Sequence, residues 1–334
     1  MIDKQRVLAE LARTPFRRAW WAPTGLLQTI GAMRRAPSTM AFCSEVLATA
    51  DGDELHLHTV DGGSAAAPTV LLLHGLEGSR YSPYVQAMAR AATARGWRFV
   101  ALEFRSCSGV PNRCQRTYHS GETTDLAFVV ATLVRRWPAA PLLPIGYSLG
   151  GNVLLKWLGE TGDGAPANVC AAAAVSPPFD LGVCATKCDT RYGGAIARHF
   201  LRTLIPKAIA KERQFPDCCD VEAVRRCRTF RRFDDLVTAP MHGFRDAMDY
   251  YTTQSSAPLL PAIRRPTLLL AAQDDPLLAP EVLPHAAAAA SPFLVPQFPA
   301  HGGHVGFVDG GTPWRPRRWA EAQALRFFAC VLST

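Results

Sequence analysis

The chain has 334 residues and a formal net charge of +8, and its 48% hydrophobic content is enough for a sizeable core in one large α/β domain or two smaller ones. Its ten cysteines are scattered, so we expect reduced thiols rather than the disulfide framework of a small secreted protein. Residues 1–18 are charged throughout and no run reaches the roughly 18 uncharged apolar residues of a spanning helix, so we expect a soluble, cytoplasmic protein.

Residues 1–43 are predicted to form an N-terminal arm that packs on the following domain. The stretch 16–30 is aromatic and is interrupted by proline and glycine. Its Trp20-Trp21 pair suits either core packing or a membrane interface, and core packing is the safer expectation. Two extended stretches between Ser44 and Val60 then flank an Asp-Gly-Asp turn signal, which predicts an antiparallel hairpin.

After the hairpin, predicted strands alternate with predicted helices. We expect strands at 69–75, 98–103, 141–145, 169–175, 266–272 and 293–298, and helices at 84–95, 124–137, 152–158, 280–290 and 318–331. This alternation predicts an α/β fold with a mostly parallel, doubly wound sheet, built from core residues 44–176 and 259–334. Ligands of such sheets bind at the carboxyl ends of the strands.

Residues 177–258 interrupt the alternation with Arg-rich helical pieces and no convincing strand, which predicts a helical cap insertion over the carboxyl edge of the sheet. The basic run Arg225–Arg232 is interpreted as a solvated helical face, one that anionic lipid surfaces would attract. No nucleic-acid partner is expected, because no binding fold accompanies it. Five cysteines of the cap lack metal-site spacing, so no metal is expected: Cys184, Cys188, Cys218, Cys219 and Cys227.

The run Gly146-Tyr147-Ser148-Leu149-Gly150 joins an apolar strand to an apolar helix. This is the G-x-S-x-G pattern of a nucleophile elbow in the strand–turn–helix context that it requires. The glycines would let strand and helix pass closely while Ser148 sits on a strained turn. A chance match is the alternative, because glycine and serine occur in many ordinary turns.

A serine nucleophile needs a histidine base and a carboxylate that orients the histidine, in the chain order Ser, Asp or Glu, His. Asp274 and Asp275 follow one predicted strand, and His301 and His304 follow the last one. Asp275 is preferred because it directly precedes Pro-Leu-Leu, whereas Asp274 suits a local Asx-type bond. His304 is preferred because flanking glycines allow it to swing over Ser148, which leaves His301 a structural role.

The loop after the strand at 69–75 is expected to complete an oxyanion hole. The backbone N–H groups of Leu76 and Leu149 are the predicted donors, and His74 could instead be a packed loop residue. His119 and Glu122 suit substrate contact, but Ser120–Thr123 also resembles a helix N-cap, and a structural role is favoured.

Several motifs together resemble the YheT-type α/β-hydrolases, bacterial relatives of the eukaryotic abhydrolase-domain lipases. They are found at 105–113, 118–123, 146–152, 176–181 and 301–307, and the similarity extends from about Leu26 to the C-terminal helix. The resemblance implies a serine hydrolase with Ser148, Asp275 and His304 as its triad. Two positions differ: Ser106 replaces a glycine of the family pattern, and Gly25–Thr29 lacks the family's N-x-H before Gln-Thr.

These residues predict a carboxylic-ester hydrolase that works through an acyl-enzyme, without cofactor or metal. The resemblance implies short- or medium-chain acyl esters or acylglycerol-like lipids as substrates, and peripheral contact with a lipid surface stays open. An acyltransferase with the same triad would differ by transferring the acyl group to an added alcohol. A non-catalytic ligand-binding protein with this fold would have an unreactive serine.

Overall fold

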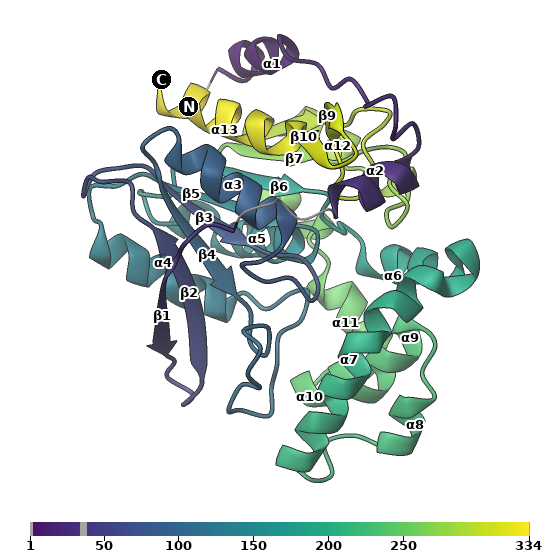
Figure 1. Ribbon diagram of the computed structural model, residues 1–334. Helices are drawn as coiled ribbons and strands as arrows, with labels where there is room; N and C mark the ends of the chain where they lie inside the picture. Colours follow the sequence, from purple (N-terminus) through teal and green to yellow (C-terminus); the bar gives the residue numbers. More distant parts are fainter. Residues whose placement is uncertain (1–2, 34–38, 334) are drawn as a thin grey trace.

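The computed structural model describes residues 3–33 and 39–333 and contains one large, mostly parallel sheet (Figure 1). Its strands lie in the order β1-β2-β4-β3-β5-β6-β7-β8. They are β1 (Cys43–Ala48), β2 (Glu54–Val60), β3 (Thr69–Leu73), β4 (Arg98–Glu103), β5 (Leu142–Tyr147), β6 (Ala172–Val175), β7 (Thr267–Leu270) and β8 (Leu294–Gln297). β1 and β2 form the predicted antiparallel hairpin, β2 is antiparallel to β4, and the remaining neighbours are parallel.

Helices cover both faces of this sheet. One face packs against α3 (Pro83–Thr93), α13 (Trp319–Leu332) and, outside them, α1 (Lys4–Ala12). The other packs against α4 (Thr124–Arg136), α5 (Leu149–Thr161) and α12 (His285–Ala290). Every residue of β3, β4 and β5 is buried, because these strands are covered on both sides. The predicted α/β-hydrolase fold is therefore confirmed.

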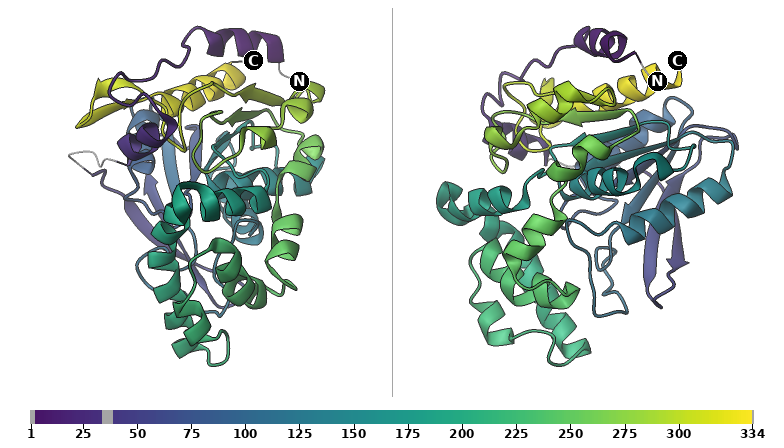
Figure 2. Two further views of the ribbon diagram at one scale, coloured as in Figure 1. Left: turned by 90° about the vertical axis from the view of Figure 1, so that its right-hand side faces the viewer. Right: turned by 180° about the vertical axis from the view of Figure 1, so that it is seen from behind.

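The predicted cap, residues 177–258, is helical in the structure and lies beside the carboxyl edge of the sheet (Figure 2). It contains α6 (Leu181–Thr190), α7 (Ala195–Gln214), α8 (Val221–Arg225), α9 (Phe230–Phe233), a π-helical turn at Asp234–Thr238, α10 (Ala239–His242) and α11 (Ala247–Gln254). Its two ends are joined, because Ala257 N–H donates to the Phe179 carbonyl over 3.0 Å and Leu181 N–H donates to Ser255 Oγ over 2.9 Å.

The basic run of the cap is exposed, but it does not form one helical face. α8 ends at Arg225 and α9 begins at Phe230, so the run spans two short helices and the turn between them. Part of its charge is paired within the cap, since Glu222 lies 3.9 Å from Arg225 and 3.6 Å from Arg226. The arginines are therefore a solvated surface, as predicted, with a different local structure.

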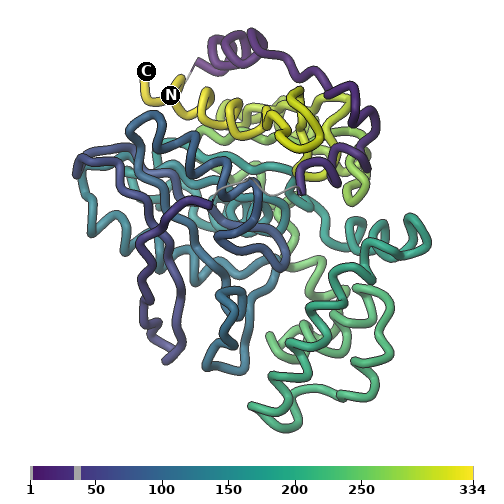
Figure 3. Tube along the Cα trace, viewed as in Figure 1, coloured from purple at the N-terminus to yellow at the C-terminus, as the bar shows by residue number. Residues whose placement is uncertain are grey.

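Three features near the chain ends differ from the sequence-based prediction. A second, two-stranded sheet is formed by β9 (Val308–Thr312) and β10 (Arg315–Arg318), where no strand was predicted. The Ala-rich helix starts only at His285, after a short 3₁₀ turn at Pro280–Val282. The N-terminal arm contains α2 (Gly25–Ala32) as well as α1, and it passes over the C-terminal part of the chain (Figure 3).

Candidate active site

Ser148 stands at the sharp turn between β5 and α5. Its backbone has φ 51° and ψ −122°, a strained conformation for a residue with a side chain. A Cβ atom on Gly146 would come within 2.2 Å of the Gly150 carbonyl oxygen, and one on Gly150 within 2.5 Å of the His74 carbonyl oxygen. The two glycines therefore allow the close passage of strand and helix that the motif predicts.

His304 lies between Ser148 and Asp275. Its Nε2 is 2.8 Å from Ser148 Oγ, and its Nδ1 is 2.9 Å from Asp275 Oδ2. Asp275 is fully buried and His304 side chain is only 10% exposed. The three residues come from the loops after β5, β7 and β8, so parallel strands bring together residues far apart in sequence.

Asp275 also makes the local turn bonds that the sequence assigned to Asp274. Its Oδ1 accepts hydrogen bonds from the Leu277 and Leu278 amides at 2.7 and 3.1 Å, which leaves Oδ2 for His304. Asp274 instead points to the other histidine: its Oδ2 is 3.2 Å from His301 Nδ1. The prediction of a local Asx-type bond at Asp274 does not match these contacts.

The His304 loop is held by the N-terminal arm. The His304 backbone N–H donates to Thr29 Oγ1 over 2.8 Å, and the buried Gln28 side chain accepts from Val308 N–H and donates to the Val308 carbonyl. A Cβ on Gly303 would come within 2.2 Å of the Gly25 carbonyl oxygen. Sequence reasoning missed this role of α2, for which the Gln28-Thr29 pair was the only signal.

The Asp275 loop is held by the cap. Lys187 on α6 donates to the Asp275 carbonyl over 3.1 Å and also contacts the Leu278 carbonyl. Arg191 contacts the same Asp275 carbonyl at 3.4 Å. The two loops that present the acid and the histidine are thus each fixed by a segment outside the sheet.

A cavity of about 160 Å³ lies between the core and the cap, next to Ser148. Its wall is mostly apolar on the cap side, where it is formed by Leu181, Cys188, Phe200, Leu204, Phe233, Val237 and Met241. Glu77 and Lys207 also line it, and their ion pair at 2.8 Å connects the loop after β3 to α7. The mostly apolar lining suits a hydrocarbon chain.

The predicted oxyanion donors, Leu76 and Leu149, both line this cavity with Ser148. Leu149 is the first residue of α5, so its N–H has no partner within the helix. On either side of Leu76, the Gly75 N–H donates to the Tyr84 hydroxyl and the Glu77 N–H to the Tyr118 hydroxyl. These contacts fix the loop in a conformation that includes φ 58° at Glu77.

His74 is packed inside the same loop. Its Nε2 accepts from the Phe104 N–H at 3.1 Å, so the ring proton resides on Nδ1, 2.7 Å from the Gly75 carbonyl. Burial lowers the pKa of His74 to about 4. The alternative interpretation of His74, as a packed loop residue, matches this geometry.

The 105–113 motif anchors a loop to the sheet. The Arg105 guanidinium is buried and pairs with Asp53 and Asp125, each at 2.7 Å, and with Asp51 at 2.9 Å. Ser106 has φ 62°, in the left-handed region where glycine is favoured, and its Oγ lies 2.5 Å from Asn112 Oδ1. The family's glycine at this position is therefore explained by backbone conformation.

His119 and Glu122 lie at the boundary between core and cap. The Thr124 N–H donates to Glu122 Oε1 over 2.9 Å, so the carboxylate caps α4, whereas the N-cap residue Thr123 makes no side-chain cap bond. The His119 ring contacts the His242 ring of the cap at 4.6 Å, and burial lowers the pKa of His119 to about 3. Both side chains have structural contacts, although His119 also lines the cavity.

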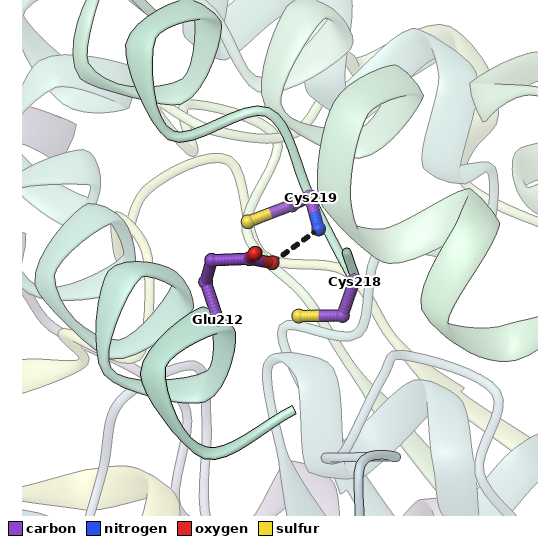
Figure 4. Close-up of side chains that lie close together, drawn as sticks. All are labelled: Glu212, Cys218 and Cys219. Carbon is purple, nitrogen blue, oxygen red and sulfur yellow. Dashed lines mark hydrogen bonds between the residues drawn. The ribbon is translucent and has the colours of Figure 1, made fainter. Parts of the chain in front are cut away.

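Within residues 3–33 and 39–333, one group of three side chains has the spacing of metal ligands (Figure 4). Glu212, Cys218 and Cys219 place their donor atoms within 4.8 Å of one another. The Glu212 carboxylate already accepts the Asp217 and Cys219 N–H groups, each at 2.8 Å. Burial raises the pKa of Cys218 to about 12, which favours a protonated thiol, and a tetrahedral site would still need a fourth ligand.

The comparisons with known proteins agree with this geometry. Residues 68–311 match the family model described as the alpha/beta hydrolase fold. The esterase-named protein YheT of Escherichia coli (strain K12) is 40% identical over 277 residues, which are 82% of this chain and 80% of YheT. The chain belongs to the YheT-type α/β-hydrolases. Within this family the chain is also 32% identical to phospholipase ABHD3 of Mus musculus, over 81% of this chain and 68% of the relative.

A solved structure supports the fold of this hydrolase. The Pyrococcus furiosus esterase Pf2001 superposes with a TM-score of 0.53 at 16% identity, over 81% of this chain and 88% of that chain. The relatives together support a hydrolase of the esterase and lipase kind. In the described part of the chain, no helix has both the length and the apolar character needed to cross a bilayer.

Proposed function

We propose that this hydrolase cleaves carboxylic esters through an acyl-enzyme formed on Ser148. The observation that carries the proposal is the continuous hydrogen-bonded series from Asp275 through His304 to Ser148, with distances of 2.9 and 2.8 Å. Ser148, at the end of this series, lines a mostly apolar cavity. The homologous esterases and phospholipases make ester chemistry the natural use of this arrangement.

In the proposed first half-reaction, Ser148 Oγ attacks the ester carbonyl carbon and its proton passes to His304 Nε2. Asp275 keeps the Nδ1–H tautomer of His304 and stabilises the imidazolium. The Leu76 and Leu149 N–H groups stabilise the oxyanion, and each such donor typically contributes ~3 kcal/mol in the transition state. His304 then protonates the leaving alkoxide, so the alcohol departs and an acyl-Ser148 ester remains.

In the second half-reaction, His304 takes a proton from water, whose oxygen attacks the acyl carbon. Collapse of this second tetrahedral intermediate returns the proton to Ser148 and releases the carboxylic acid. The net reaction consumes one ester and one water and gives one acid and one alcohol. An alcohol that replaced the water would make the same residues an acyltransferase.

The test uses p-nitrophenyl esters of graded acyl length and a fluorophosphonate probe. The wild type is expected to hydrolyse the esters and to be labelled, and Ser148→Ala is expected to lose both signals. Product analysis with an added alcohol separates hydrolysis from acyl transfer. A wild type that neither hydrolyses the esters nor reacts with the probe would refute the proposal and favour a non-catalytic binding protein.

The cavity supports short- and medium-chain acyl esters or acylglycerol-like lipids as substrates. Leu204→Trp, on the apolar cap wall, is expected to shift the preference toward shorter acyl chains. Val183→Trp is a matched control, because Val183 is exposed on α6. An unchanged chain-length profile in Leu204→Trp would place the acyl group elsewhere.

A further inference from the structure

The N-terminal helix α2 has two faces of opposite environment. Its inner face, with Gly25, Gln28, Gly31 and Ala32, is buried against the rest of the protein. Its outer face is formed by Leu26, Leu27, Ile30 and the adjoining C-cap residue Met33, which are 36, 43, 52 and 57% exposed. A helix without a polar outer face is unusual in water and indicates that something apolar covers it.

Exposed apolar side chains are concentrated in this region. Among residues 3–33 and 39–333, twelve large hydrophobic side chains are exposed, and five of them lie between Trp20 and Met33. A sixth, Trp314, lies in the β9–β10 turn and is 72% exposed. We call the side chains of Trp20, Leu26, Leu27, Ile30, Met33 and Trp314 the arm surface.

The β9–β10 hairpin packs on the arm, so the segments that carry the arm surface are neighbours. The Ala19 N–H donates to the Val308 carbonyl over 3.0 Å, and Trp21 Nε1–H donates to the Gly311 carbonyl over 3.2 Å. Figure 1 shows α2 beside β9 and β10. The exposed Trp20 and Trp314 thus belong to segments next to an apolar helix, and exposed tryptophans are typical of membrane interfaces.

The two segments that carry the arm surface are positively charged. The sequence contains no aspartate or glutamate between Glu10 and Glu45, or between Gly310 and Arg318. Exposed arginines occur in both segments, at Arg17 and Arg315 among others. Arginines near an anionic bilayer are attracted to its surface charge, so this composition is complementary to anionic lipid.

We propose that the arm surface docks this hydrolase on an anionic lipid bilayer, with the outer face of α2 in the boundary between headgroups and acyl chains. The tryptophans would lie at headgroup level and the arginines on lipid phosphates. A second copy of the chain suits the surface less well, because a two-fold interface would bring the same arginines together. This proposal adds a location to the proposed ester hydrolysis, and docking itself does not need a working triad.

The helix α2 connects the arm surface to the loop that carries His304. Thr29 on its inner face accepts the His304 N–H at 2.8 Å, so the helix separates the arm surface from the active site by about one helix diameter, roughly 10 Å. A bilayer on the outer face would therefore lie next to the loop that carries the histidine.

The experiment is co-sedimentation with vesicles of phosphatidylcholine alone and of equimolar phosphatidylcholine and phosphatidylserine. Wild type is expected to bind the anionic vesicles at least about tenfold more tightly. The double variant Leu27→Ser/Ile30→Ser should lose binding about tenfold or more, and Arg17→Glu/Arg315→Glu should remove the preference for the anionic vesicles. Ser148→Ala should bind as wild type, which separates docking from catalysis.

Matched controls lie on the cap. Val183→Ser/Met248→Ser removes exposed apolar groups there, and Arg225→Glu/Arg226→Glu reverses exposed cap charges. These variants should bind as wild type. The arm and cap variants should keep wild-type melting temperatures and hydrolysis of water-soluble esters. The proposal is wrong if the arm variants bind vesicles normally, if the cap variants lose binding instead, or if light scattering shows that the arm surface pairs two copies.

Discussion

Two aspartate–histidine pairs lie side by side at the carboxyl edge of the sheet, on the same two loops. Asp275 and His304 are buried and 2.9 Å apart, whereas Asp274 and His301 are 22 and 46% exposed and 3.2 Å apart. The free nitrogen of His301 faces Arg18 Nη1 at 3.3 Å, so it accepts a hydrogen bond and Nδ1 carries the proton. Both histidines therefore carry a proton on Nδ1, and they differ in the group that contacts Nε2.

This difference supports the proposal that the buried pair, and not the exposed one, acts with Ser148. A histidine that faces an arginine can only accept from a permanent cation, while His304 faces a hydroxyl that can give up its proton. Burial strengthens the Asp275–His304 interaction, because the local dielectric is lower than at the solvent-exposed pair. An aspartate–histidine pair is therefore not enough to predict a catalytic site. The prediction rests on the burial of the pair and on the group that contacts the second nitrogen of the histidine.

The largest expected effect comes from breaking the buried pair. Asp275→Asn should lower kcat for a short p-nitrophenyl ester by about 10⁴-fold, because the amide no longer holds the Nδ1–H tautomer of His304. The asparagine oxygen can still accept the Leu277 and Leu278 amides, so the fold should be retained. Steady-state kinetics and circular dichroism check both statements. Wild-type activity in this variant would remove Asp275 from the proposed triad.

A third histidine, His74, shows the effect of burial in a side chain whose hydrogen bonds are to backbone groups and not to a carboxylate. The pKa of His74 is lowered from 6.5 to about 4 by burial, so the unfolded chain binds a proton that the folded chain does not as the pH falls through this range. The free energy of unfolding should therefore fall toward acid by about 1.4 kcal/mol per pH unit from this residue. We expect the free energy of unfolding, measured by urea unfolding at several pH values between 6.5 and 4, to depend less steeply on pH in His74→Gln than in the wild type. An equal slope would mean that His74 is protonated in the fold.

A smaller effect is expected from the arm that holds the histidine loop. Thr29→Val removes the acceptor of the His304 N–H and should lower kcat about tenfold with little change in KM, whereas Thr29→Ser should restore it. Kinetics of the two variants at matched melting temperature make the comparison. If valine and serine behave alike, the hydrogen bond does not position His304.

The smallest effect should come from the exposed pair. Asp274→Asn keeps an oxygen for the Gly303 N–H and loses only the charge of a carboxylate in a partly exposed contact with His301, which is worth at most about 1 kcal/mol. We expect less than a threefold change in kcat/KM, measured beside Asp275→Asn. A loss as large as that of Asp275→Asn would exchange the roles of the two aspartates and break the comparison.

The central sheet could be predicted because its strands are buried on both sides. The sequence predicts a strand at 98–103, and β4 has the same bounds, because its apolar centre Phe99–Leu102 lies between two predicted helices and is buried in the sheet. The order of Ser148, Asp275 and His304 along the chain followed from the motifs, and the structure brings these side chains within hydrogen-bond distance. Their catalytic roles stay predictions.

Contacts between distant segments could not be predicted. The Gln28-Thr29 pair matches the family pattern, but it does not indicate that Thr29 meets the His304 N–H, 275 positions away. The β9–β10 hairpin contains Pro313, Pro316 and several arginines, a composition unfavourable for a buried strand, and it forms as an exposed pair of strands. Asp274 was misread because its partner, His301, lies on another loop.

The hydrogen bonds that join the two ends of the cap have an evolutionary consequence. Phe179 and Ala257, and likewise Leu181 and Ser255, meet at the base of the insertion, so the cap enters and leaves the sheet at one place. A segment whose ends are adjacent can be lengthened, shortened or exchanged for another without moving the strands beneath it. Replacement of this segment would change the cap wall of the cavity while the strands stay in place, but Lys187 and Arg191 would have to be kept to hold the Asp275 loop.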